Sequence, residues 1–161
     1  MAVKQLYPRG DFPAPGLFRR VAGAFYDLML CVALVMVLTL AYHQGVLRFI
    51  YGPEALQAMA DAGQLDQDPL LSVLVILAIY GFFGLFWTLR GQTLGMQAWR
   101  MRVQQPDGTS ITWRQSVIRV SIALVSWLLG GLGIWWSLWD RQSRTWPDIV
   151  SGTRTVVLPK E

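Results

Sequence analysis

The chain has 161 residues, of which 53% are hydrophobic and 15% are charged, and its formal net charge is +4. A typical soluble protein has about 25% charged residues, and a soluble domain of this size buries only about two thirds of its unfolded surface. The composition therefore excludes a soluble globular protein and predicts a single membrane domain. Cys31 and His43 are the only residues of their types; we expect no disulfide, no metal cluster and no cofactor.

The first predicted element is a transmembrane helix over residues 21–42, preceded by a tail over residues 1–20. The helix block contains one charge, Asp27. A cleaved signal peptide is the alternative, but its apolar region usually has about 7 to 15 residues, and this block is longer and contains an acid. We therefore expect the helix to remain in the mature protein. The tail has four basic residues: Lys4, Arg9, Arg19 and Arg20.

Residues 43–69 are predicted to form an external loop, followed by a second transmembrane helix over residues 70–89. This second block has no charge and, at about 1.5 Å per residue, spans the roughly 30 Å hydrocarbon core. Basic residues concentrate in cytoplasmic loops, so their placement predicts orientation. The loop has one basic residue and four acids, Arg48 against Glu54, Asp61, Asp66 and Asp68, so we expect the loop outside and the N-terminus inside.

Residues 90–119 are predicted to form a small cytoplasmic β element. Trp99, Met101 and Val103 alternate with polar residues and precede a turn over residues 106–108, and residues 109–113 supply a return strand. A second strand-like segment over residues 153–157 could pair with this hairpin, which would be marginal alone. The element has five basic residues: Arg90, Arg100, Arg102, Arg114 and Arg119.

The third apolar element, residues 120–139, is interrupted by Gly130, Gly131 and Gly133. Each arm is too short to cross the membrane, which favours a re-entrant hairpin that returns the tail, residues 140–161, to the cytoplasm. Thirteen basic residues would then lie inside and one outside. The alternative is a glycine-kinked third span, which would place nine basic residues inside and five outside. The predicted fold class is an all-α polytopic membrane protein with two full transmembrane helices, a glycine-broken third and a small cytoplasmic β-hairpin or sheet.

Asp27 is the residue that most directly suggests a function, because an acid at membrane depth is costly unless it is paired, protonated or hydrated. Arg20 lies two helical turns earlier on the same face, and Arg119 could approach from the third element. We expect one of these arginines to pair with Asp27. Two roles for Asp27 remain open: it could belong to an ion pair that packs the helices together, or it could act in a proton or ion relay.

The chain resembles the RDD family of small membrane proteins along nearly its whole length. Three segments carry this resemblance. Residues 19–27, RRVAGAFYD, match its first helix; residues 91–95, GQTLG, with MRV at 101–103 and DG at 107–108, match its loop motif; residues 139–153, WDRQSRTWPDIVSGT, match its closing segment. Met96 and Pro147 depart from the lysine and histidine common there. The resemblance implies that Arg20, Asp27 and either Asp140 or Asp148 are the characteristic residues.

The closing segment is expected to lie near the start of the first helix, where Asp140 and Asp148 could form a polar network with Arg20. The loop motif contains Gly91, Gln92, Thr93 and Gly95. Of these, Gln92 and Thr93 could join the network or merely cap a loop. We find no nucleophile with a base and no phosphate-binding glycine loop, so we predict no enzyme activity. The basic residues flank the spans, which favours anionic lipid over nucleic acid as a partner.

Two functions remain open. The family resemblance implies transport of an unidentified solute, for which sodium/proton exchange has been suggested, and Asp27 would serve the transport site. We expect a homo-oligomer, because three short elements enclose little volume by themselves. The alternative is a non-transporting scaffold that binds a partner through its cytoplasmic β element. The predicted location is the bacterial inner membrane.

Overall fold

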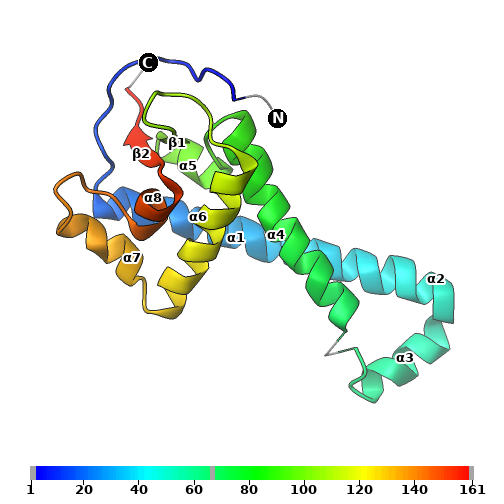
Figure 1. Ribbon diagram of the computed structural model, residues 1–161. Coiled ribbons are helices and arrows are strands. Elements are labelled where there is room, and N and C mark those ends of the chain that lie inside the picture. Colours follow the sequence, from blue (N-terminus) through cyan, green and yellow to red (C-terminus); the bar gives the residue numbers. More distant parts are fainter. Residues whose placement is uncertain (1–2, 66–67, 160–161) are drawn as a thin grey trace. The chain divides into compact units, whose positions relative to one another are not determined.

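The computed structural model describes residues 3–65 and 68–159 of the chain. Two compact units are distinguished, Met1–Leu28 together with Tyr80–Glu161, and Met29–Ile79. Two long helices, α1 and α4, each contribute to both units (Figure 1). Asp66 and Lys160, which enter the orientation argument, lie outside the described residues.

The first membrane helix is longer than predicted. Helix α1 (Leu17–Leu40) continues through a π-helix (Ala41–Leu47) into α2 (Arg48–Tyr51), giving a helical segment of 35 residues. The first part of the segment predicted as an external loop is therefore helical, because the polar residues there do not stop a helix that meets no proline. The helix ends at Gly52, whose φ of +80° is accessible to glycine.

Helix α3 (Pro53–Asp61) occupies half of the remaining predicted loop. In this second unit Tyr42, Leu47 and Leu56 are buried against partly buried leucines. The Tyr42 hydroxyl donates to Asp68 Oδ2 at 2.7 Å, and Asp68 Oδ1 accepts the backbone N–H of Leu70 at the start of α4. Asp68 thus caps α4 while it anchors Tyr42.

Helix α4 (Pro69–Leu89) agrees with the predicted second membrane helix. After it, Gly91 has a φ of +71°, and a Cβ there would lie 2.7 Å from the carbonyl oxygen of Val103. Glycine is therefore required at this turn. The chain then forms the short helix α5 (Leu94–Ala98), whose N-cap Thr93 accepts the backbone N–H of Met96.

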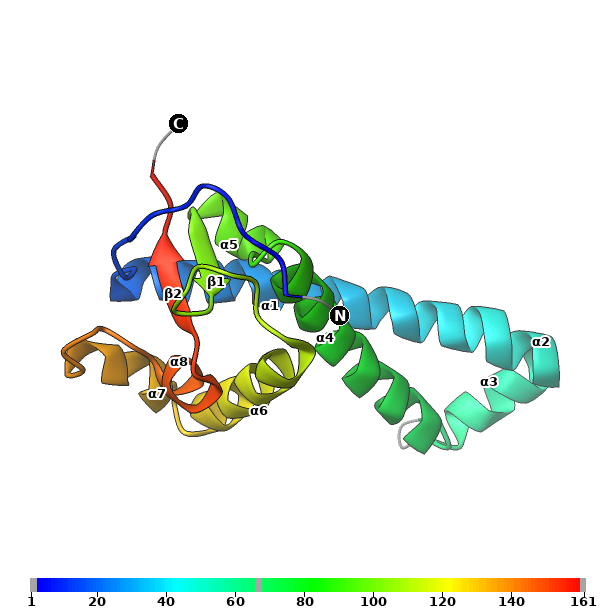
Figure 2. The same cartoon turned by 45° about the horizontal axis from the view of Figure 1, so that its top comes forward.

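The β element consists of strands that are distant in sequence. Strand β1 (Met101–Gln104) pairs antiparallel with β2 (Arg154–Val157), so that Met101 faces Val157 and Gln104 faces Arg154 (Figure 2). The predicted return strand over residues 109–113 does not form, because Thr109 makes one isolated bridge with Gln5 and the chain then enters a helix. Pairing with the C-terminal segment was predicted correctly.

The third apolar element is broken, as its glycines predict. Helix α6 (Trp113–Leu128) begins earlier than residue 120, because Thr112 and Gln115 form a capping box. Gly130 and Gly131 have φ of +70° and +79°, and helix α7 (Leu132–Trp135) and a 3-10 turn (Trp136–Leu138) leave at 106° to α6. Helix α8 (Trp146–Ser151) packs on α6.

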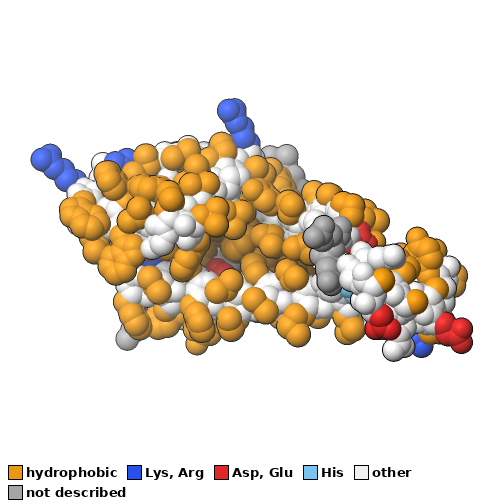
Figure 3. Space-filling model, turned by 90° about the horizontal axis from the view of Figure 1, so that it is seen from below, with side chains coloured by type: hydrophobic (Ala, Val, Ile, Leu, Met, Phe, Trp, Pro, Cys, Tyr) orange, Lys and Arg blue, Asp and Glu red, His pale blue; other side chains and the backbone are white. Residues whose placement is uncertain are grey.

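Among the described residues, two helical segments, Leu17–Tyr51 and Pro69–Leu89, are long and apolar enough to cross a membrane, and the bent α6–α7 pair could count as a third. Large apolar side chains are exposed along both helices, including Met36 and Leu77 at 67% and 61%. Figure 3 shows such side chains gathered over one face of the surface. Water would solvate this surface poorly, so it requires lipid and the chain is a membrane protein.

Candidate functional site

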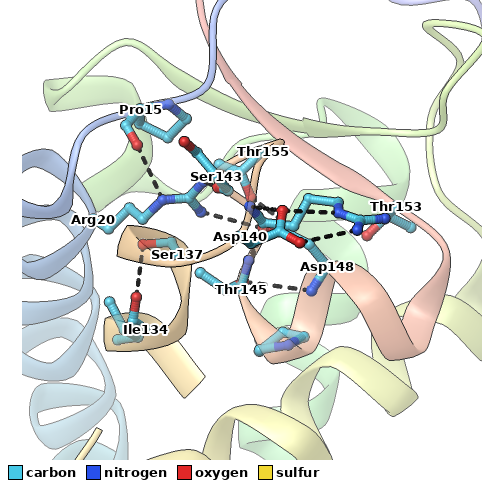
Figure 4. A network of polar contacts seen from close by, with 12 residues as sticks. Pro15, Arg20, Ile134, Ser137, Asp140, Ser143, Thr145, Asp148, Thr153 and Thr155 are labelled. Atoms are coloured by element: carbon cyan, nitrogen blue, oxygen red, sulfur yellow. Dashed lines mark hydrogen bonds and ion pairs between the residues drawn. The ribbon is translucent and has the colours of Figure 1, made fainter. Parts of the chain in front are cut away.

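A buried polar cluster is centred on Asp148, which is 1% exposed. Helix α1 supplies Arg20, whose Nη1 lies 3.2 Å from Asp148 Oδ2, and α6 supplies Arg119, whose Nη1 lies 2.8 Å from Oδ1. One carboxylate therefore bridges two guanidinium groups from helices that are far apart in sequence. Figure 4 shows Arg20 reaching the segment around Asp148.

Local sequence places the Asp148 carboxylate. Thr145 is the N-cap of α8 and Asp148 is at the third helical position, where its Oδ2 accepts the backbone N–H and the hydroxyl of Thr145 at 3.0 and 2.8 Å. Thr155 of β2 donates to Oδ1 at 2.9 Å. Burial alone raises the pKa of Asp148, but the charges of Arg119 and Arg20 and the Thr145 hydrogen bond outweigh burial and lower this pKa to about 2. The carboxylate is therefore ionised at neutral pH.

The two arginines are also held by other partners. Arg20 donates from Nε to the carbonyl oxygen of Pro15 at 3.1 Å and from Nη2 to that of Ser143 at 2.7 Å. Arg119 donates to the hydroxyls of Thr153 and Thr155. Its guanidinium also lies 5.3 Å from the centre of the Trp87 ring. The cluster, defined here as the arginine clamp (Arg20, Arg119 and Asp148), joins α1, α6, α8 and β2.

Asp27 lies outside the arginine clamp. It is 6% exposed, and its Oδ2 accepts the hydroxyl of Thr93 at 2.5 Å while Oδ1 accepts the backbone N–H of Gly95 at 3.0 Å. A Cβ on Gly95 would lie 2.6 Å from the carbonyl oxygen of Gly23, so glycine allows α5 to approach α1 this closely. Among the described residues no cationic group forms an ion pair with Asp27.

The predicted pairing of Asp27 with Arg20 or Arg119 is therefore wrong. Spacing along a helix places Arg20 on the same face as Asp27, but its long side chain turns toward Ser143 and Asp148. The acid that both arginines bind is Asp148, which the sequence alone does not distinguish from Asp140.

Asp140 forms a separate, more exposed pair. Its Oδ1 accepts from Arg144 Nη2 at 3.0 Å, and its Oδ2 accepts the backbone N–H of Gln142. Hydrogen bonding from Arg144 lowers the pKa of Asp140 and raises that of Arg144. Within the described residues no hydrogen bond joins Asp140 to the arginine clamp, so the expectation that it meets Arg20 is wrong.

The loop motif divides between two roles. Thr93 and Gly95 bind Asp27, whereas Gln92 donates from Nε2 to the carbonyl oxygen of Met101 at 2.8 Å and Gly91 makes the turn after α4. The hydroxyls of Thr145, Thr153 and Thr155 were not singled out from sequence. The spacing of Thr145 and Asp148 is a capping-box signal that could have identified the first; the other two depend on tertiary contacts.

A buried clamp of two arginines and an aspartate, beside apolar helices with a second buried acid, gives this membrane protein an internal polar site. The model of the RDD family matches residues 14–152. The chain therefore belongs to the RDD family, as the three sequence segments indicate. No curated protein and no solved structure matches it.

Proposed function

We propose that the protein is a small transporter of an ion or solute and that Asp27 is the group that binds and releases a proton or monovalent cation during transport. The observation that carries this proposal is the bonding of Asp27 to neutral donors. Thr93 and Gly95 are its hydrogen-bond partners, so protonation would not leave a buried arginine without its counter-charge. The proposed role involves no chemical catalysis.

Asp148 is a poor candidate for the same role. Its charge is shared by Arg20 and Arg119, and neutralising it would leave two buried cations unpaired. The arginine clamp is therefore assigned to holding the helices around the site. Na⁺/H⁺-like exchange is one form that the proposed transport could take.

The proposed setting is a bacterial inner membrane, with the N-terminus, the β element and the C-terminus in the cytoplasm and the α6–α7 pair re-entrant. The 106° bend at Gly130 and Gly131 supports the re-entrant form. The distribution of basic residues supports the orientation, and anionic lipid is the proposed partner of these residues. A homo-oligomer is proposed because a few short elements enclose little volume. Periplasmic activity of a C-terminal reporter fusion would contradict this topology.

The test is flux in proteoliposomes containing the purified protein, measured for protons, alkali cations and a panel of organic ions. Asp27→Asn keeps the size of the side chain and removes its charge, so we expect it to abolish flux while the protein stays folded. Asp61→Asn, at an exposed acid of α3, is the matched control and should transport normally. Flux that persists in Asp27→Asn, or no flux by the wild type for any ion tested, would refute the proposal.

The alternative is a scaffold that binds a partner through the β element. It is favoured by the arginine clamp, because hydrogen bonds of Thr155 with Arg119 and Asp148 tie β2 to the helices. Addition of a partner strand is opposed by the occupied edges: Val103 donates its N–H to Gly91 and Val157 donates its N–H to Pro13. If the protein is a scaffold, Asp27→Asn should reduce partner recovery or stability and should leave flux unchanged.

A further inference from the structure

A polar cavity of about 390 Å³ lies between the N-terminal segment and the β element. Three arginines line it, one from each of three segments: Arg9, Arg102 and Arg154. Gly10 and Gly108 also line it. The space beside Gly108 is open, since a Cβ added there would meet no atom within 4 Å. The cavity is separate from the arginine clamp and from Asp27, which contribute no residue to its lining.

Arg102 is the unusual member of this set, because it is 2% exposed and yet has no carboxylate partner among the described residues. Its Nε and Nη2 donate to Gln104 Oε1 at 2.9 and 2.7 Å, and Nη2 also donates to the carbonyl oxygen of Pro8 at 3.0 Å. Nη1 is buried and has no hydrogen-bond partner in the described structure. All of its acceptors are therefore neutral.

A buried guanidinium without a counter-charge is costly, and a missing hydrogen bond adds to this cost. Burial lowers the pKa of Arg102, but an arginine stays protonated in proteins. Binding of an anion in the cavity would supply the missing charge. By contrast, the buried Arg20 and Arg119 have Asp148 as their internal anion.

The other two arginines are held by exposed contacts, which for Arg154 include a hydrogen bond from Nη2 to the carbonyl oxygen of Pro106. Arg9 is exposed and donates to the Tyr7 hydroxyl at 3.1 Å. Arg154 pairs with Asp11 at 3.5 Å, but the Asp11 side chain is 95% exposed, so this pair can exchange readily. The remaining acid of the lining, Asp107, already accepts the backbone N–H and the hydroxyl of Thr109.

We propose that this cavity is a binding site for a phosphate group, with Arg102 as its buried contact and Arg9 and Arg154 closing over the ligand. Guanidinium groups match phosphate oxygens with parallel hydrogen bonds, and several arginines around one pocket suit an anion with three or more acceptors. The volume lies in the range of about 300 to 1,000 Å³ typical of small-molecule sites, which favours an organic phosphate over a bare ion. A phospholipid headgroup and a soluble phosphate ester share this chemistry. The proposal stands independently of transport through Asp27.

The test is calorimetric titration of the full-length protein, purified in a maltoside detergent that carries no phosphate, with glycerol 3-phosphate. Arg9→Gln is the principal variant because the side chain is exposed and its loss should not affect folding. A charge-assisted hydrogen bond contributes about 1.5 to 3 kcal/mol, so we expect Arg9→Gln and Arg154→Gln each to weaken binding about tenfold or more. Arg141→Gln, an exposed arginine outside the cavity, is the matched control and should bind like the wild type.

The source of the phosphate is decided by repeating the titration in phosphatidylcholine nanodiscs with and without phosphatidylglycerol. Competition by phosphatidylglycerol would identify a lipid headgroup, and binding unaffected by it would identify a soluble ester; both support the site. No binding of either probe by the wild type, or binding that Arg9→Gln and Arg154→Gln weaken no more than Arg141→Gln does, would overturn the proposal.

Discussion

Replacing the Asp148 carboxylate tests whether the arginine clamp stabilises the fold. Asp148→Asn keeps the side-chain shape but leaves Arg20 and Arg119 buried without a counter-charge. Removing one partner of a buried ion pair typically costs about 3 to 5 kcal/mol. For a chain of this size, 1 kcal/mol changes the Tm by about 2 to 4 °C, so we expect the Tm to fall by about 6 to 20 °C.

The assay is thermal unfolding of the purified variants in detergent, followed by circular dichroism. Asp11→Asn is the control, because its carboxylate also pairs with an arginine but is 95% exposed, and its removal should change the Tm little. A Tm for Asp148→Asn within 2 °C of the Asp11→Asn value, about the shift expected for 1 kcal/mol, would refute the reasoning that the clamp holds the helices together.

The remaining predictions concern pH, packing and capping. The pKa of Asp148 is lowered from 3.8 to about 2 in the folded protein, so its ionisation stabilises the fold by about 2 kcal/mol above pH 4, and this contribution should disappear as the pH falls from 4 to 2. The difference in unfolding free energy between wild type and Asp148→Asn measures it, and a difference that is constant down to pH 2 would contradict the assignment. Gly95→Ala should destabilise the protein by about 1 to 3 kcal/mol because its Cβ would overlap the Gly23 carbonyl, whereas Gly81→Ala, with no atom within 4 Å, should not; equal Tm values would contradict the close approach of α5 to α1. Thr112→Ala should lower stability by about 1 kcal/mol through loss of the α6 cap, measured by the same unfolding assay, and an unchanged Tm would show that this cap is not required.

The amino-acid sequence determined the membrane class, the position of α4 and the break between α6 and α7. Long uncharged runs specify a membrane helix by local hydropathy, and α4 begins and ends within one residue of the predicted block. Glycines at 130 and 131 specify the break between α6 and α7, because each adopts a positive φ. The end of the first helix was misplaced, since polar residues after position 42 do not end a helix without a proline or a glycine turn.

Only the tertiary structure decided which polar groups meet. Arg20 and Asp148 are separated by 128 residues, and Asp27 and Thr93 by 66, so no local spacing distinguishes these partners from others of the same type. The side chain of arginine is long enough to reach several acids, and the packing of α1, α6 and α8 selects Asp148. The pairing of β1 with the C-terminal segment was predicted, but only the structure shows that the segment after the turn enters helix α6 and supplies no return strand. Buried hydrogen-bond partners depend on the whole fold, whereas membrane insertion depends on each segment by itself.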